Sequence, residues 1–257
     1  MKKTWMLVLT AVFAASCGRS GFMEKYFQDN ALRATLVVVS MKTGKEHVYN
    51  EARSREEFLP ASTFKIPNTL IALQEGALRD ASEVIRWDGV DRGRAEWNRD
   101  QTLATAFRSS CVWFYRELAR RVGREKYDRY LALMRYGNAD AGGEADGFWL
   151  NGALRLSARG QVEFLKGIVA EKFPFDRKHY AALKEAMFVE KAGACSIYAK
   201  TGLAPDARPP VGWYAGYAET PDDTWIFACN LEITGPGDAR FRKEIVHRGL
   251  EELGVTR

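Results

Sequence analysis

The spacing of apolar residues changes twice along this chain of 257 residues, from a two-residue repeat to a helical repeat and back. Residues 35–41 (T-L-V-V-V-S-M) are mainly apolar and β-branched, and the chain turns at 42–45 and returns over 46–50, which predicts a β-hairpin. Between about 66 and 188 the apolar positions mostly follow helical spacing. Gly, Pro and Asp then separate three further predicted strands, at 195–200, 211–219 and 224–233.

The helical middle of the chain divides at capping residues. The predicted helices cover 66–75, 103–122, 125–135 and 158–170. Gly76, Gly123 and Gly137 stand near the ends of the first three, and Ser157 is a favourable N-cap for the fourth. A last amphipathic helix, with apolar residues at 241, 245, 250 and 253, ends at Gly254. Strands at both ends with helices between them predict one antiparallel sheet built from both termini, with a helical lobe inserted in the middle.

Composition and charge narrow the class of protein. With 46% hydrophobic residues, seven Trp and fourteen Phe, the chain can bury a sizeable core in one large domain or in two lobes that share a cleft. The formal net charge is +5, but no run of five or six Lys or Arg occurs, so nucleic acid is not favoured as a partner. The four Cys and three His form neither C-x-x-C nor H-x-x-x-H, so no metal site is expected.

The N-terminus has the pattern of a secretory signal peptide. Lys2 and Lys3 precede an apolar stretch at 6–15, which is too short to span a membrane, and cleavage is predicted after Ser16. The mature chain is then 17–257, and the protein is predicted to be exported. The same A-A-S-C sequence also resembles a bacterial lipobox, which leaves a lipid anchor at Cys17 as an open alternative. No later segment has 18 continuous apolar residues, so no membrane-spanning segment is expected.

Candidate chemistry begins at the S-T-F-K sequence of 62–65. One turn of α- or 3₁₀-helix places Ser62 and Lys65 on the same face, and Pro67 is compatible with the start of a helix. A serine nucleophile needs an adjacent base, and a neutral amine or its derivative can serve as that base. By itself the motif is weak, because roughly one S-x-x-K is expected by chance in a chain of this length. Taken alone, the motif is better explained by a helix-capping Ser and a solvated Lys.

A K-T-G sequence at 200–202 strengthens this interpretation. It is predicted to end a strand, where Gly202 would let another backbone or a ligand approach closely. K-T-G also occurs at 42–44, but there a hairpin turn explains it. Only the second copy follows the candidate nucleophile.

Five motifs together resemble the class D (oxacillinase-type) serine β-lactamases. They are P-A-S-T-F-K-I-P-N at 60–68, S-C-V at 110–112, Y-G-N at 136–138, F-W-L at 148–150 and K-T-G at 200–202. Their order and spacing agree through the whole mature chain. Asn151, where an acidic residue often follows F-W-L, and Cys111, in the variable middle of S-x-V, are two departures that could alter the range of substrates.

The resemblance implies an α+β fold of the β-lactamase/transpeptidase type. Its five-stranded antiparallel sheet is flanked by helices and lies beside an all-helical lobe, with the active site between them. Applied to this chain, it gives one penicillin-recognising serine-enzyme domain over 17–257. The sheet lobe takes about 21–60 and 189–257, and the helical lobe takes about 61–188.

The resemblance also implies a catalytic role for several residues. By this resemblance, Ser62 would be the nucleophile that opens the β-lactam ring, and Lys65 would be N-carboxylated and act as general base. CO₂ or bicarbonate would then be required, but no other cofactor. An apolar surround lowers a lysine pKa and so favours the modification, and Val112 and Leu150 would supply it. The indole N–H of Trp149 would hydrogen-bond the modified lysine, the alternative being that Trp149 only fills the core.

Three further residues, together with the backbone of Ser62, complete the implied reaction. Ser110 would relay a proton to the lactam nitrogen, although a helix cap would also explain it, and Lys200 would supply positive charge. Backbone N–H groups of Ser62 and Leu203 would form the oxyanion hole.

Substrate binding is implied at the same cleft. Arg242 would bind the carboxylate of the β-lactam, although Arg240 lies only two residues away, and Thr201 would add a hydroxyl next to Gly202. Tyr136 is expected at a loop edge that shapes the pocket, unless Y-G-N is only a helix C-cap.

The predicted function is therefore hydrolysis of penicillin-type antibiotics in the periplasm, which confers resistance. A penicillin-binding transpeptidase usually has S-x-N as its middle motif, and Val112 argues against it. A β-lactam sensor domain that stays acylated remains an alternative, although such domains normally follow several membrane helices. A Ser-His-Asp hydrolase is poorly supported, because no G-x-S-x-G occurs. Substrate preference and oligomeric state are left open.

The cysteines of an exported protein invite a disulfide interpretation. If the sheet is that of the family, strand 211–219 lies between the strands that carry Cys195 and Cys229. Two inter-strand steps amount to roughly 9–10 Å, beyond the ~7 Å Cα limit of a disulfide. Cys17 and Cys111 have no obvious partner, so no intramolecular disulfide is predicted.

Overall fold

The computed structural model describes residues 21–256. The predicted signal peptide at 1–16 and the lipidation alternative at Cys17 lie outside these residues. Between residues 21 and 256, no helix is long and apolar enough to cross a membrane.

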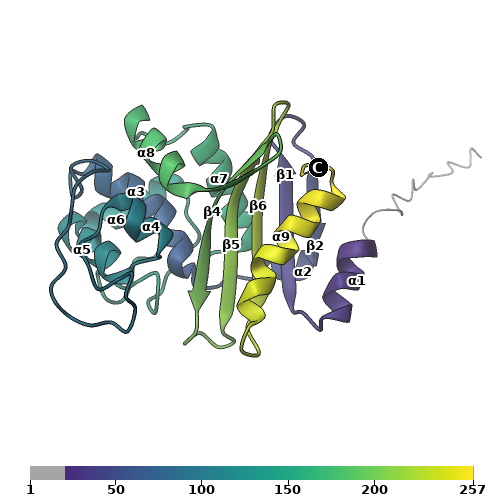
Figure 1. Ribbon diagram of the computed structural model, residues 1–257, viewed down its shortest axis with the longest axis horizontal. Helices are drawn as coiled ribbons and strands as arrows, with labels where there is room; N and C mark the ends of the chain where they lie inside the picture. Colours follow the sequence, from purple (N-terminus) through teal and green to yellow (C-terminus); the bar gives the residue numbers. More distant parts are fainter. Residues whose placement is uncertain (1–20, 257) are drawn as a thin grey trace, which may run out of the picture.

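One antiparallel sheet occupies the middle of the molecule, with the strand order β2-β1-β6-β5-β4-β3 (Figure 1). The strands are β1 (Ala34–Ser40), β2 (Glu46–Tyr49), β3 (Phe188–Ala192), β4 (Cys195–Ala204), β5 (Val211–Glu219) and β6 (Thr224–Glu232). The predicted hairpin is confirmed as β1 and β2, and β1 pairs with β6. The sheet is therefore built from both ends of the chain, as the apolar pattern predicts.

The sheet has six strands rather than the five expected. The sixth, β3, is an edge strand whose five residues are all exposed, and its pairing with β4 shifts register between Phe188 and Glu190. An exposed strand has no apolar alternation to reveal it in the sequence. The prediction also ended β4 too early, because this strand continues through Lys200 to Ala204.

Helices cover both faces of the sheet and form a lobe at one side of it (Figure 1). Their bounds are α1 (Gly21–Asp29), α2 (Glu51–Arg55), η1 (Ala61–Phe64), α3 (Lys65–Gln74), α4 (Leu103–Arg108), α5 (Val112–Val122), α6 (Arg124–Met134), α7 (Ala158–Val169), α8 (Arg177–Met187), η2 (Asp238–Arg240) and α9 (Phe241–Glu252). The predicted N-cap of α7 is present, because Ser157 Oγ accepts from the Gly160 N–H at 3.0 Å.

The single helix predicted over 103–122 is wrong, because the chain breaks between α4 and α5. Ser110 has a φ of 58°, which a helix does not allow. The Cys111 N–H turns back to the Ala106 carbonyl at 2.8 Å, which closes α4 before α5 begins at Val112. The break places Ser110 in a turn at the edge of the helical lobe.

Two separate cores explain why the sheet is buried on both faces. Leu36 and Val38 of β1 belong to the core shared with α1 and α9, whereas Val37 and Val39 belong to the core shared with the helical lobe. Helix α7 packs against β1, β5 and β6, although its sequence falls inside the range 61–188 expected for the helical lobe. One face of the sheet thus packs against the helical lobe through the core that contains Val37 and Val39.

Thiol titration of the denatured, unreduced protein should find Cys111, Cys195 and Cys229 all free. The structure supports this expectation, because the three thiols are unpaired and β5 separates β4 from β6. Detection of a Cys195–Cys229 disulfide would contradict the strand order. A reduced sample of the same protein is the control for complete titration.

Candidate active site

The candidate nucleophile lies at a local change of helix type. Residues 61–64 form the 3₁₀-helix η1, and α3 begins at Lys65. This turn places Lys65 Nζ 3.0 Å from Ser62 Oγ, within hydrogen-bond distance. Ala61, directly before Ser62, has a φ of 48°, a left-handed conformation that is unusual for a residue with a side chain.

Lys65 is a buried amine. Its side chain is 1% exposed, its Nζ lies 5.0 Å from the centre of the Tyr115 ring, and no acidic side chain among the described residues pairs with it. Burial lowers the pKa of Lys65 to about 7, against a smaller opposing effect of the nearby Cys111 thiol. Near neutral pH a large fraction of this amine is therefore uncharged and able to accept a proton.

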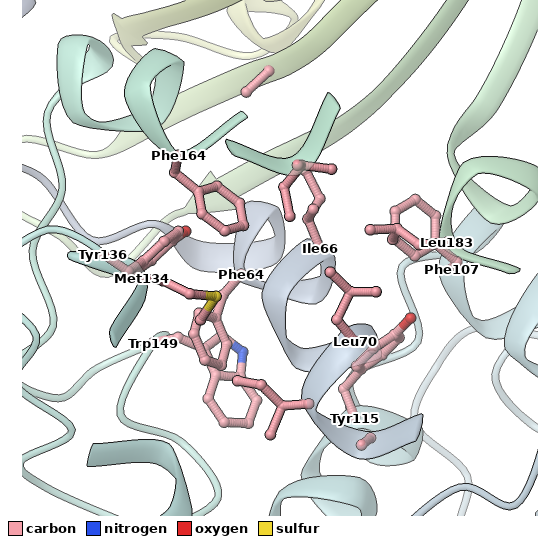
Figure 2. Close-up of a cluster of buried hydrophobic side chains, with 14 of the residues drawn as sticks. Phe64, Ile66, Leu70, Phe107, Tyr115, Met134, Tyr136, Trp149, Phe164 and Leu183 are labelled. Carbon is pink, nitrogen blue, oxygen red and sulfur yellow. The ribbon is translucent and has the colours of Figure 1, made fainter. Parts of the chain in front are cut away.

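The indole of Trp149 lies in the aromatic cluster next to α3 (Figure 2). It stacks on Phe64, with ring centres 5.2 Å apart, and meets Phe148 edge to face at 5.0 Å. Its Nε1 is buried and has no hydrogen-bond partner within residues 21–256. A buried donor without a partner costs about 1–3 kcal/mol, so this N–H fits an acceptor that the unmodified side chains do not supply.

The K-T-G residues reach the site from the sheet. Lys200 is 4% exposed and donates to the Thr201 carbonyl at 3.0 Å. Burial, together with the nearby charges of Lys65 and Arg242, holds the pKa of Lys200 well below its ordinary value. The structure therefore brings together two buried amines that are 135 positions apart in the sequence.

Gly202 allows β4 to pass close to η1. A Cβ at this position would lie 3.1 Å from the Pro60 carbonyl oxygen, 3.1 Å from Trp213 Cβ and 3.3 Å from Thr63 Cγ2. The absence of a side chain thus sets the separation between the K-T-G strand and the turn that carries Ser62.

We expect Gly202→Ala to lower the free energy of unfolding by about 1–3 kcal/mol, because the new methyl group overpacks this contact. The displacement of β4 should also lower kcat/KM by about tenfold, since small misplacements of reacting groups are costly. Thermal unfolding and steady-state kinetics measure the two effects. Gly235→Ala is the matched control, because its Cβ would meet nothing closer than 3.8 Å. Wild-type behaviour of Gly202→Ala would show that the close approach has no importance.

A cleft of about 530 Å³ opens between the helical lobe and the sheet. Among the predicted site residues, it is lined by Ser110, Val112, Leu150, Thr201, Gly202, Leu203 and Arg242. Arg242 donates to the Gly202 carbonyl at 2.8 Å. Arg240 instead stacks on Phe241 at 4.6 Å and lies 3.6 Å from Glu244, so the structure places Arg242, and not Arg240, at the cleft.

Tyr136 does not line the cleft, contrary to the expectation. Its side chain is fully buried, with its ring 5.8 Å from Phe64 and 4.8 Å from Phe164, and its hydroxyl lies 3.4 Å from Gln161 (Figure 2). Asn138 holds the following loop by accepting from the Arg155 N–H at 3.0 Å. The Y-G-N sequence therefore supports the core and the loop behind the site.

Sequence reasoning missed several neighbours of these residues. Tyr115 faces Lys65, and the Phe107 ring centre lies 5.7 Å from Lys200 Nζ. Trp97 donates through its indole N–H to the Ser109 carbonyl at 2.9 Å and so holds the turn that contains Ser110. Helical spacing marks Phe107 and Tyr115 as buried, but it does not show which side chains they face. Within the described residues, no group of three or more His, Cys, Asp or Glu side chains could hold a metal ion.

The chain is similar to known proteins over nearly its whole length. The model of the penicillin binding protein transpeptidase domain matches residues 33–251. The chain is 36% identical over 258 residues to β-lactamase OXA-48 of Klebsiella pneumoniae, covering 96% of this chain and 97% of that protein.

Solved structures agree with this relationship. FUS-1 (OXA-85), a class D β-lactamase from Fusobacterium nucleatum, is 36% identical, with a TM-score of 0.89 over 92% of this chain and 98% of that one. The class D β-lactamase YbXI from Nostoc is 34% identical, with a TM-score of 0.88 over 91% of this chain and 98% of that one. The chain belongs to the class D serine β-lactamases.

Proposed function

We propose that this protein hydrolyses the β-lactam ring of penicillin-type antibiotics through an acyl-enzyme on Ser62, and so confers resistance to them. The observation that carries the proposal is the 3.0 Å contact between Ser62 Oγ and Lys65 Nζ, with the pKa of Lys65 lowered to about 7. A hydroxyl next to a base that is uncharged near neutral pH is an activated nucleophile.

In acylation, the Ser62 proton passes to the base at position 65 while Oγ attacks the carbonyl carbon of the lactam. Backbone N–H groups of Ser62 and Leu203 stabilise the oxyanion. The C–N bond of the ring then breaks, and Ser110 passes a proton to the departing nitrogen beside the Lys200 amine. The position of Ser110 on the cleft wall supports this role.

The surroundings of Lys65 fit its N-carboxylation by CO₂. The modification requires an uncharged amine, which burial provides, and an acceptor placed there would meet the unpartnered Trp149 N–H. Carboxylated Lys65 would supply an anionic general base both for acylation and for activating the water that releases the product. Val112 and Leu150, which line the cleft, would limit the access of bulk water to this pocket, and no other cofactor would be needed.

Arg242 and Thr201 bind the carboxylate of the substrate. Arg242 is positioned by its bond to the Gly202 carbonyl, its Nε is buried without a partner among the described residues, and both side chains line the cleft. A guanidinium offers this carboxylate two parallel hydrogen bonds.

We further infer that the mature chain, 17–257, is one penicillin-recognising domain with a sheet lobe and a helical lobe. In the full sequence, the pattern of basic, apolar and small residues at 1–16 supports export to the periplasm. Lipidation at Cys17 is the alternative to a free N-terminus of the mature chain.

Turnover of a chromogenic cephalosporin tests the function. We expect many product molecules per protein, and a transient adduct on the peptide that contains Ser62 when the reaction is quenched early and analysed by mass spectrometry. The Ser62→Ala variant is the control and should form no adduct, because it lacks the hydroxyl that is acylated. Labelling that stops at one molecule per protein, with no turnover, would identify a sensor domain and contradict the proposal.

A further inference from the structure

The helical wall of the cleft carries two arginines that the proposed reaction does not use. Arg94 and Arg108 are exposed and line the cleft, and neither forms an ion pair within residues 21–256. Arg116 also lines it, but its Nη1 lies 3.8 Å from both Glu144 and Asp146, which balance its charge. An excess of positive charge therefore remains on this wall.

Both arginines lie next to the turn that contains Ser110, Arg94 through contacts of Trp97 and Arg108 by its position in the sequence. The Arg94 guanidinium lies 4.9 Å from the centre of the Trp97 ring, and the Trp97 indole donates to the Ser109 carbonyl at 2.9 Å. The Trp113 indole in turn donates to the Trp97 carbonyl at 2.7 Å. Arg108 is the last residue of α4, two positions before Ser110. The Trp97 ring thus holds the Arg94 guanidinium beside this turn, and the end of α4 places the exposed Arg108 next to it.

The ring carboxylate of a β-lactam does not need these two groups. Arg242, which we assign to that carboxylate, belongs to α9 on the sheet side of the cleft, whereas Arg94 and Arg108 belong to the helical side. Asp206 is the one acidic residue among those that line the cleft, and it lies on the segment between β4 and β5. The helical wall is therefore suited to a second anion at the other end of the substrate.

We propose that Arg94 and Arg108 form a specificity site for β-lactams whose acyl side chain carries a carboxylate of its own. This inference rests on the proposed function and adds a substrate class to it. A single exposed ion pair has a small effect, and the effects of two guanidinium groups that bind the same carboxylate add to one another. We therefore expect about a three- to tenfold effect on kcat/KM when both are removed.

The test compares benzylpenicillin with α-carboxybenzylpenicillin, which differ only in the side-chain carboxylate. In the Arg94→Gln/Arg108→Gln double variant, kcat/KM for the carboxylated penicillin should fall about three- to tenfold, and the value for benzylpenicillin should change by less than about twofold. Added NaCl at about 0.5 M should reduce the preference of the wild type, because salt screens exposed charges. Arg99→Gln, an exposed arginine on the same loop but outside the cleft lining, is the matched control and should leave the ratio unchanged.

Two results would overturn the specificity site. An equal fall for both penicillins would show long-range attraction of any anion, and an unchanged ratio would show that the guanidinium groups do not contact the side chain. Failure of the proposed function is distinguishable from both, because the wild type would then hydrolyse neither penicillin. Equal melting temperatures of the variants would show that the changes in rate do not arise from unfolding.

Discussion

Replacing Lys65 with Met is expected to lower kcat for a penicillin by about 10²- to 10⁴-fold, the usual contribution of a general base. Met preserves most of the buried volume but cannot accept the Ser62 proton or react with CO₂. Stopped-flow kinetics with acid quench measures acylation and release separately, and both should slow. Lys42→Met is the matched control, because Lys42 is exposed in the hairpin turn of the other K-T-G sequence. Wild-type turnover by Lys65→Met would exclude Lys65 as the base.

The pH dependence of the wild type follows from the same amine. Because burial lowers the pKa of Lys65 to about 7, the protonated form dominates below pH 7 and the neutral form above it. Only the neutral amine reacts with CO₂. Dilution into bicarbonate-free buffer at about pH 6 should therefore reduce activity, and added bicarbonate should restore it, whereas at about pH 8 the loss should be much smaller. Activity indifferent to bicarbonate at both pH values, with no added mass on Lys65 at the higher one, would contradict carboxylation.

Trp149→Phe is expected to slow release of the acyl group by about 10- to 100-fold while acylation of Ser62 slows less. A hydrogen bond to a charged group contributes about 1.5–3 kcal/mol, and Phe removes the donor while keeping a ring against Phe64. Pre-steady-state kinetics should show a burst followed by accumulation of the acyl-enzyme, and high bicarbonate should partly restore release.

Trp225→Phe is the control for this substitution, since Trp225 packs in the other core, with α1 and α9. Wild-type release by Trp149→Phe would show that Trp149 only fills the core. An equal loss in the control variant would instead indicate a general effect on stability.

The helix break at Ser110 shows where sequence reasoning stops. Apolar positions keep helical spacing from 103 to 122, so a continuous helix is the natural prediction. The structure interrupts it with one residue at φ 58° and with a hydrogen bond from Trp97, a residue outside the segment. Local periodicity does not contain that contact. The S-x-V motif marks Ser110 as a candidate site residue, and the structure places it at the cleft. The helical backbone predicted for Ser110 is wrong.

At Tyr136 the expectation that came from the family resemblance was wrong, whereas at Ser110 the error came from local periodicity. The Y-G-N motif marks a position after α6, and the expectation of a pocket edge followed from the resemblance. Its direction depends on packing against Phe64 and Phe164, which come from η1 and α7. A side chain at a helix end can point into a core or a cleft, and only the neighbouring elements decide between them.

The sequence alone determined the features that depend on short spacing. One helical turn puts Ser62 and Lys65 together, and β-branched runs produce the hairpin and the three long C-terminal strands. Only the tertiary structure decided the pKa of Lys65, the unpartnered N–H of Trp149, the choice of Arg242 over Arg240 and the sixth strand. These features depend on burial and on contacts between elements far apart in the chain. Desolvation is a property of the assembled core, and no local segment contains it.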